Sequence, residues 1–75
     1  VGAGKYGRKL GMDFLHPAYS MVTESYVQDA ADHGLKVNTW TVNDWDSMEY
    51  FARIGVHAII GNFPDLAEKA LNPYR

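Results

Sequence analysis

The chain has 75 residues, no cysteine and an apolar share of 47%, which allows one small folded domain without a disulfide framework or a thiolate metal site. Its formal net charge of −2 gives no electrostatic basis for binding nucleic acid or an anionic membrane. No apolar run approaches the roughly 20 residues that span a bilayer, and the composition is compatible with a cytoplasmic, membrane-associated or extracytoplasmic location.

Residues 1–11 form a basic lead-in that is rich in glycine. The run Gly2-Ala3-Gly4-Lys5 is similar to part of a phosphate-binding loop. A complete loop needs a preceding strand, and a Ser or Thr after the lysine that opens a helix, and neither is present. We therefore expect a flexible lead-in or the end of a preceding helix. Because the chain begins without methionine, we also expect it to be part of a longer protein.

Residues 12–75 alternate between strand and helix patterns. Strands are indicated by β-branched and aromatic runs, and helices by apolar residues at spacings of three and four. The expected strands are 12–16, 35–42 and 56–61, and the expected helices are 22–33, 45–54 and 64–71, with a loop over 18–21. The continuous apolar character of 56–61 predicts a strand buried on both faces.

Polar residues and glycines mark the ends of the expected helices. Thr23 is expected to cap the first helix, and either Asn43 or Asp44 the second. Gly34 and Gly55 are expected to end these two helices, because glycine readily adopts the left-handed conformation found there. The residues expected to form the buried helix stripes are Val27, Ala30, Ala31, Met48, Phe51, Ala52, Leu66, Ala67, Ala70 and Leu71.

Three strands alternating with three helices predict an α/β fold with a parallel sheet, because short connections of this kind form right-handed crossovers. Such a unit is incomplete. Its outer strands are open edges, and one face of the sheet has no helix to cover it. The pattern is that of three-eighths of a TIM (β/α)₈ barrel.

Residues 12–65 resemble the last three strand–helix units of glycerophosphodiester phosphodiesterases. The resemblance is carried by Leu15-His16-Pro17, by residues 34–44 with the sequence GLKVNTWTVND, and by residues 59–65 with the sequence IIGNFPD. These pieces occur in the family's order and spacing. The combination is more specific than the short run Trp-Thr-Val-Asn alone.

The resemblance implies a metal-dependent hydrolase that uses Ca²⁺ or Mg²⁺ and converts glycerophosphodiesters into glycerol 3-phosphate and an alcohol. In this family the catalytic histidines and the acidic metal ligands lie in His-Arg-Gly, Glu-x-Asp and His-Asp motifs on early strands. None of these motifs occurs in this sequence. We therefore expect the chain to be a C-terminal fragment that supplies pocket wall and scaffold, binds no metal itself and is inactive alone.

Five residues are candidates for contact with the substrate: Trp40, His16, Asn43, Asn62 and Phe63. The resemblance places Trp40 at the pocket mouth, where an indole packs against glycerol or head-group carbons. Each candidate has a structural alternative. These alternatives are a core position for Trp40, a surface loop for His16, helix capping for Asn43 or Asn62, and a core plug for Phe63. We expect His33 to interact with a helix C-terminus and His57 to lie at the opposite, non-catalytic end of the strands.

Two functional hypotheses stand beside the enzyme. The first is a non-catalytic module derived from such a barrel; like an isolated fragment of the enzyme, it is expected to self-associate through its open edges. The second is an unrelated flavodoxin-like or nucleotide-binding half-domain. A nucleotide-binding half-domain predicts a glycine-rich turn after the first strand, whereas this chain has His16-Pro17-Ala18 there. No i, i+4 pair of histidines and no nucleophile elbow offers a second active site.

Overall fold

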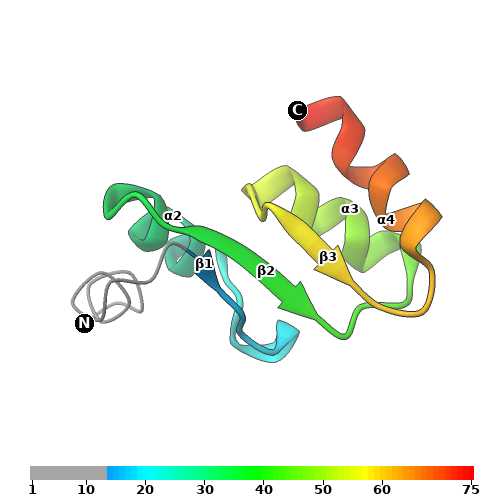
Figure 1. Ribbon diagram of the computed structural model, residues 1–75, viewed down its shortest axis with the longest axis horizontal. Coiled ribbons are helices and arrows are strands. Elements are labelled where there is room, and N and C mark those ends of the chain that lie inside the picture. Colours follow the sequence, from blue (N-terminus) through cyan, green and yellow to red (C-terminus); the bar gives the residue numbers. More distant parts are fainter. Residues whose placement is uncertain (1–13) are drawn as a thin grey trace.

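The computed structural model describes residues 14–75, so the predictions for the lead-in and for residues 12 and 13 lie outside the described residues. Strands and helices alternate along the described chain (Figure 1). The elements are β1 (Phe14–Leu15), η1 (Tyr19–Met21), α2 (Glu24–Asp32), β2 (Lys36–Trp40), α3 (Trp45–Ile54), β3 (Ala58–Ile60), α4 (Pro64–Leu71) and η2 (Asn72–Tyr74), where η denotes a 3₁₀ helix. The predicted α/β alternation is confirmed.

The three strands form one parallel sheet in the order β1-β2-β3. Leu15 lies opposite Val37, and Thr39 lies opposite Ile59. The predicted loop over 18–21 is in part the helix η1, and Ala18 forms an isolated parallel bridge with Trp40. The chain after β1 therefore stays beside the end of β2.

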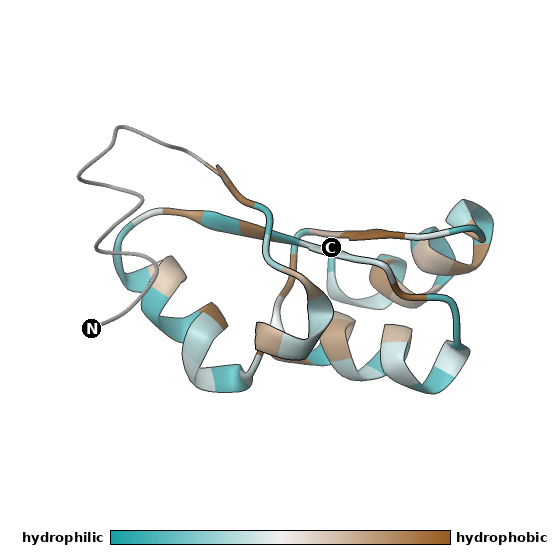
Figure 2. Cartoon of the chain, turned by 90° about the horizontal axis from the view of Figure 1, so that it is seen from below, coloured by the Kyte–Doolittle hydropathy of each residue, from teal (hydrophilic) through white to brown (hydrophobic). Residues whose placement is uncertain are grey.

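Helices cover one face of this sheet. In Figure 2, α2 and α3 lie below the strands, and α4 packs against α3 and β3. Strand side chains alternate between the faces, and the helix-facing Val37, Thr39 and Ile59 are buried. Ile60 points the other way and is 47% exposed, so the prediction that 56–61 is buried on both faces is wrong. Within residues 14–75 no element covers the second face.

The predicted helix ends are confirmed. Thr23 Oγ1 accepts a hydrogen bond from the Tyr26 N–H at 3.1 Å, which satisfies one of the free amides of the first turn of α2. Gly34 and Gly55 have φ values of 73° and 105°, a left-handed conformation that costs little only for glycine. These glycines turn the chain into β2 and toward β3. They set the positions at which both strands begin.

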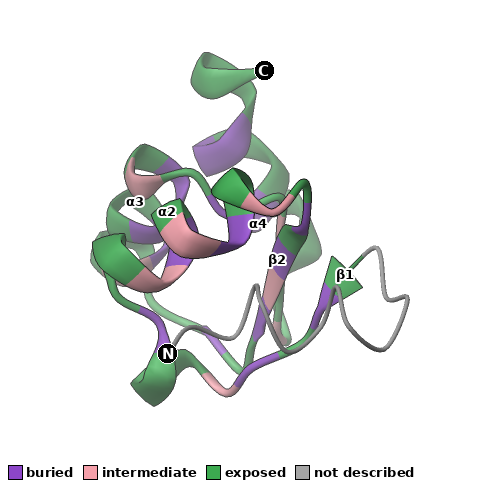
Figure 3. Cartoon of the chain, turned by 90° about the vertical axis from the view of Figure 1, so that its left-hand side faces the viewer, coloured by how far each residue is buried: buried purple, intermediate pink, exposed green. Residues whose placement is uncertain are grey.

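The core lies between the sheet and the helices, where the buried segments gather in Figure 3. Met48 and Ala30 are fully buried, and Phe51 and Ala52 beside them confirm the predicted stripe of α3. Two stripe residues are predicted wrongly, because Ala31 and Leu66 are exposed. The surfaces of α2 and α4 that pack are therefore narrower than their apolar patterns suggest.

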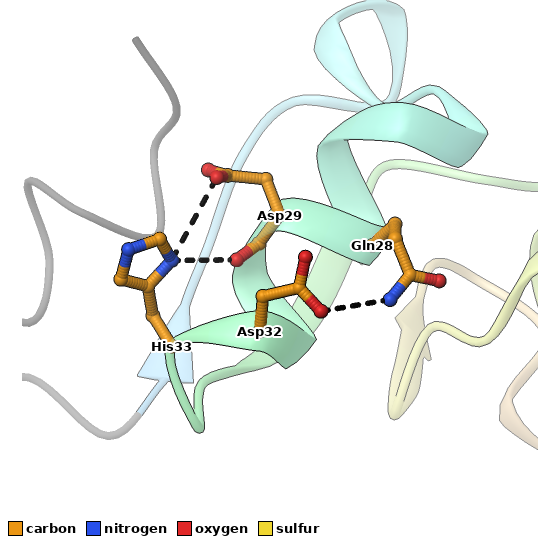
Figure 4. A network of polar contacts seen from close by, with 4 residues as sticks. All are labelled: Gln28, Asp29, Asp32 and His33. Carbon is orange, nitrogen blue, oxygen red and sulfur yellow. Dashed lines mark hydrogen bonds and ion pairs between the residues drawn. The ribbon is translucent and has the colours of Figure 1, made fainter.

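The C-terminal end of α2 carries a local polar network (Figure 4). His33 Nδ1 lies 2.9 Å from the Asp29 carbonyl oxygen and 3.7 Å from Asp29 Oδ1. Gln28 Nε2 donates to Asp32 Oδ1 at 3.0 Å one turn along. The expectation that His33 interacts with a helix C-terminus is confirmed, because the ring contacts one of its last carbonyl groups. This network supports the helix and lies away from the carboxyl ends of the strands.

Asp44 is the residue that caps α3, and its Oδ2 accepts from the Ser47 N–H at 2.9 Å. This hydrogen bond lowers the pKa of the Asp44 carboxyl below its ordinary value of 3.8. A depressed native pKa contributes stability above that ordinary value, and the contribution is lost as the pH falls through the native pKa. We therefore expect Asp44→Asn to flatten the loss of stability below about pH 4, as measured by denaturant unfolding across the acid range.

The matched control is Asp46→Asn, which removes a carboxylate from the same first turn and keeps the cap. It should retain the acid-dependent loss that the Asp44 variant lacks. If the free energy of unfolding of Asp44→Asn fell as steeply at acid pH as that of the unsubstituted protein, the Asp44 carboxyl would not be the source of the acid-dependent loss.

Candidate active-site wall

All five predicted site residues lie at the edge of the sheet where its strands end. His16 follows β1, Trp40 ends β2, Asn43 lies between β2 and α3, and Asn62 and Phe63 lie between β3 and α4. All five side chains are exposed. Parallel α/β sheets bind ligands at this carboxyl edge, because the loops there converge from neighbouring strands.

The indole of Trp40 is fixed at this edge by a hydrogen bond. Its Nε1–H donates to the His16 carbonyl oxygen at 2.8 Å. The side chain is nevertheless 45% exposed, so the alternative that Trp40 belongs to the core is wrong. The hydrogen bond anchors one end of the ring, and the rest of its apolar surface is open to a ligand. Trp40 and the main chain of His16 therefore form one unit.

Asn43 and Asn62 form a second unit. Asn43 Oδ1 accepts from the Asn62 N–H at 2.8 Å, although the two residues lie 19 positions apart. Asp44 caps α3, so the capping role considered for Asn43 is wrong. The N-cap position of α4 is Phe63, so the same alternative for Asn62 is also wrong.

Phe63 stands at the start of α4. Its side chain is 49% exposed, so it is no core plug, while its carbonyl oxygen accepts from the Ala67 N–H at 3.1 Å. Trp40 and Ile60, which end neighbouring strands, are exposed as well. Exposed aromatic rings at a carboxyl edge are chemically suited to contact with the carbon atoms of a ligand.

Sequence reasoning missed Gly61, which lies against Val42 and Asn43. A Cβ atom placed there would collide with the Val42 carbonyl oxygen and with Asn43 Oδ1. The main chains of the loops after β2 and β3 therefore approach each other more closely than any other residue would allow. A glycine directly after a strand and before Asn62 is the only sequence signal for this contact.

The described residues do not themselves fit a metal site. Within residues 14–75 no three side chains of the types that ligate metals gather closely enough to hold an ion. Of the acidic residues that follow these strands in the sequence, Asp44 is already used as the cap of α3, and Asp46 and Asp65 lie in the first turns of α3 and α4. Among the described helices, none is long and apolar enough to cross a membrane.

A cavity of about 320 Å³ lies at the other end of the strands. Its lining includes Val27, Leu35, Val56 and Leu71, with His57 and Arg75 at its side. His57 precedes β3, which confirms its predicted place at the end opposite the candidate wall. The Arg75 guanidinium donates hydrogen bonds to Glu68 Oε1 at 2.8 Å and to the His57 carbonyl oxygen at 3.2 Å. This cavity is separate from the five candidate residues.

Comparison with curated proteins gives two partial matches, both to toxins of the spider Loxosceles spinulosa. Dermonecrotic toxin LspiSicTox-betaIII2 is 39% identical over 46 residues, which is 60% of this chain and 17% of the toxin. Dermonecrotic toxin LspiSicTox-betaIII1 is 43% identical over 37 residues, which is 49% of this chain and 14% of the toxin. The chain thus spans only about a sixth of the length of these relatives.

Solved structures match nearly the whole chain. A protein of Silicibacter pomeroyi DSS-3, to which glycerophosphoryl diester phosphodiesterase activity is ascribed, superposes with a TM-score of 0.84 at 28% identity and covers 99% of this chain. A glycerophosphodiester phosphodiesterase of Parabacteroides distasonis gives 0.83 at 26% identity over 99%. A phosphodiesterase of Oleispira antarctica, solved with sn-glycerol-3-phosphate, shares the fold with a TM-score of 0.78 at 24% identity over 91% of the chain.

The chain corresponds to 25%, 32% and 28% of those three structures, and the three βα units match a portion of a TIM barrel. The fold class inferred from the sequence is confirmed. The family model described as the Glycerophosphoryl diester phosphodiesterase family matches residues 3–66, and the chain therefore belongs to that family.

Proposed function

We propose that this chain is the C-terminal part of a metal-dependent glycerophosphodiester phosphodiesterase and that it supplies one wall of the substrate pocket. The proposed reaction hydrolyses a glycerophosphodiester to glycerol 3-phosphate and an alcohol. The observation that carries the proposal is the exposed indole of Trp40, held by His16 at the carboxyl edge of the sheet in a chain of this family. The Oleispira antarctica phosphodiesterase was solved with sn-glycerol-3-phosphate, which supports a glycerol phosphate as the ligand class.

In this proposal the wall binds the uncharged part of the substrate. Trp40 and Phe63 offer apolar ring surface to glycerol or head-group carbons, and His16 flanks the indole. The two asparagines complete the wall on the side of β3. None of these five residues is a lysine or an arginine, so the proposed contacts favour carbon atoms and hydroxyl groups over the phosphate.

The proposed Ca²⁺ or Mg²⁺ ion and the acid–base histidines belong to other strands of the barrel. A hard divalent cation needs several oxygen ligands, and residues 14–75 offer no cluster of acidic residues that could supply them. The sequence also contains no His-Arg-Gly or Glu-x-Asp motif. The chain alone is therefore proposed to be inactive, and the metal is proposed to act only in the longer protein.

The test is release of glycerol 3-phosphate from glycerophosphocholine, with Ca²⁺, Mg²⁺ or a chelator. The whole protein that contains this chain is expected to show metal-dependent release, and the 75-residue chain none. Trp40→Ala in the whole protein should lower kcat/KM by about tenfold, since losing contact with roughly half an indole removes about 1.4 kcal/mol.

The matched control is Trp45→Ala, because Trp45 is a similarly exposed tryptophan in the first turn of α3. It should leave kcat/KM unchanged. No metal-dependent release by the whole protein would contradict the proposed activity, while equal losses in both tryptophan variants would contradict the proposed role of Trp40.

A second candidate is a non-catalytic module that self-associates. It is favoured by the open face of the sheet, where Phe14, Trp40 and Ile60 are all exposed. Two such faces would shield each other's apolar side chains, as the layers of a sandwich do. Both candidates predict that the isolated chain self-associates through its open strands, so sedimentation does not separate them. The phosphodiesterase assay of the whole protein does, because the module predicts no activity.

A further inference from the structure

The loops after β2 and β3 are joined by one side chain. The Asn43 carboxamide oxygen accepts the Asn62 N–H at 2.8 Å. The main chain repeats the link one step earlier, where the Val42 N–H donates to the Ile60 carbonyl oxygen at 3.0 Å. Beside both hydrogen bonds lies Gly61, at which a Cβ atom would collide with Val42 and Asn43. We name this arrangement of residues 42, 43, 61 and 62 the loop clasp.

The clasp uses the acceptor of Asn43, and this separates two roles for the residue. If Asn43 bound the phosphate of a substrate, it would have to donate hydrogen bonds through Nδ2, because phosphate oxygens only accept them. A clasp needs only the carboxamide oxygen. The residue next to Asn43 takes the capping role, since Asp44 Oδ2 holds the Ser47 N–H at 2.9 Å. The carboxamide oxygen of Asn43 is therefore used in a contact between loops.

From this geometry we infer that Asn43 is a positioning residue, which acts through Asn62 and fixes the β3–α4 loop at the pocket wall. Phe63 follows Asn62 directly, and α4 begins at the next residue. Holding the Asn62 amide therefore sets the place of the Phe63 ring relative to Trp40, which ends the neighbouring strand. The inference rests on the proposed phosphodiesterase function only for its effect on turnover. The clasp itself is a property of the fold.

The test compares Asn43→Asp with Asn43→Ala in the whole protein that contains this chain. Aspartate keeps an oxygen acceptor at the same position and makes the hydrogen bond charge-assisted, but it removes the Nδ2 donor and places a negative charge at the wall. Its charge also lies near the N-terminus of α3, which favours an anion. Alanine removes the acceptor altogether. If Asn43 acts as a clasp, the aspartate variant should be less impaired than the alanine variant. If Asn43 binds the phosphate, the aspartate variant should be the more impaired of the two.

The first readout is hydrogen exchange of the Asn62 amide, which requires no activity. Asn43→Ala should lower its protection about fivefold, and Asn43→Asp should keep it within about twofold of the unsubstituted protein, since a hydrogen bond of this kind contributes about 1 kcal/mol. Unchanged protection in Asn43→Ala, or equal loss in both variants, would overturn the inference. This result is independent of whether the protein is a phosphodiesterase.

The second readout is kcat/KM for glycerophosphocholine. Asn43→Ala should lose about tenfold and Asn43→Asp should recover most of that loss, whereas a phosphate ligand predicts that the aspartate variant falls further than alanine. Asn72→Ala, an exposed asparagine at the end of α4 far from the clasp, serves as the control with unchanged activity. If hydrogen exchange gives the expected results but neither the unsubstituted protein nor its variants are active, the loop clasp is supported and the proposed function is rejected.

Discussion

Replacing Ile59 with aspartate is expected to destabilise the folded chain by about 4 kcal/mol, the largest effect on stability among the changes considered. Ile59 is 6% exposed and lies in the middle of β3, opposite Thr39 of β2 and against the helices. The substitution removes a buried aliphatic group and adds a carboxyl group with no partner. A chain of 75 residues has a free energy of unfolding of roughly 4 to 11 kcal/mol, so the variant should be largely unfolded or close to it.

The measurement is denaturant unfolding followed by tryptophan fluorescence. The matched control is Ile60→Asp, which makes the same chemical change one residue along, on the face where the side chain is 47% exposed. At concentrations where the chain is monomeric, this control should lose less than about 1 kcal/mol. Similar losses in the two variants would show that the sheet is covered on both faces.

Replacing Gly61 with alanine is expected to lower kcat/KM of the whole protein by about 100-fold, the largest effect on the proposed activity. The added Cβ would meet the Val42 carbonyl oxygen, which belongs to the main chain and cannot rotate away. The loops after β2 and β3 must then separate. A displacement of about 1 Å in groups that position a substrate is enough for a loss of this size.

Gly34→Ala is the control for this change. Gly34 ends α2 with φ at 73°, so alanine there costs about 1 kcal/mol of stability through backbone strain. Because Gly34 lies at the amino end of β2, far from the wall, kcat/KM should stay unchanged. Equal activity losses in the two glycine variants would mean that lowered stability, and not loop geometry, controls the activity.

Local chemistry made much of the fold predictable. Thr23 accepts from the first turn of α2, and Gly34 and Gly55 adopt the left-handed conformation, all as expected, because these roles depend on neighbours three or four residues away. Periodicity likewise identified the buried positions of α3. The alternation of these elements was sufficient to predict a parallel sheet and a portion of a barrel.

The wrong predictions of burial in strands and helix stripes share one cause. Ile60, Ala31 and Leu66 are apolar residues in apolar patterns, yet all three are exposed. An apolar pattern reports which residues favour burial, but burial also requires an element to pack on that side. Within residues 14–75, the sheet has helices on one face only, so the apolar side of β3 that carries Ile60 stays open.

The elements, their order and the position of five candidate residues at the carboxyl edge of the sheet could be predicted from the amino-acid sequence. The contacts between these residues could not, because they depend on the tertiary structure. Trp40 binds the His16 main chain across 24 positions, and Asn43 binds Asn62 across 19. Contacts at such separations depend on the register and twist of neighbouring strands, which bring the loops together. No local sequence pattern predicts them. Gly61 is the clearest case, because the Val42 carbonyl that excludes a side chain there lies on another strand's loop.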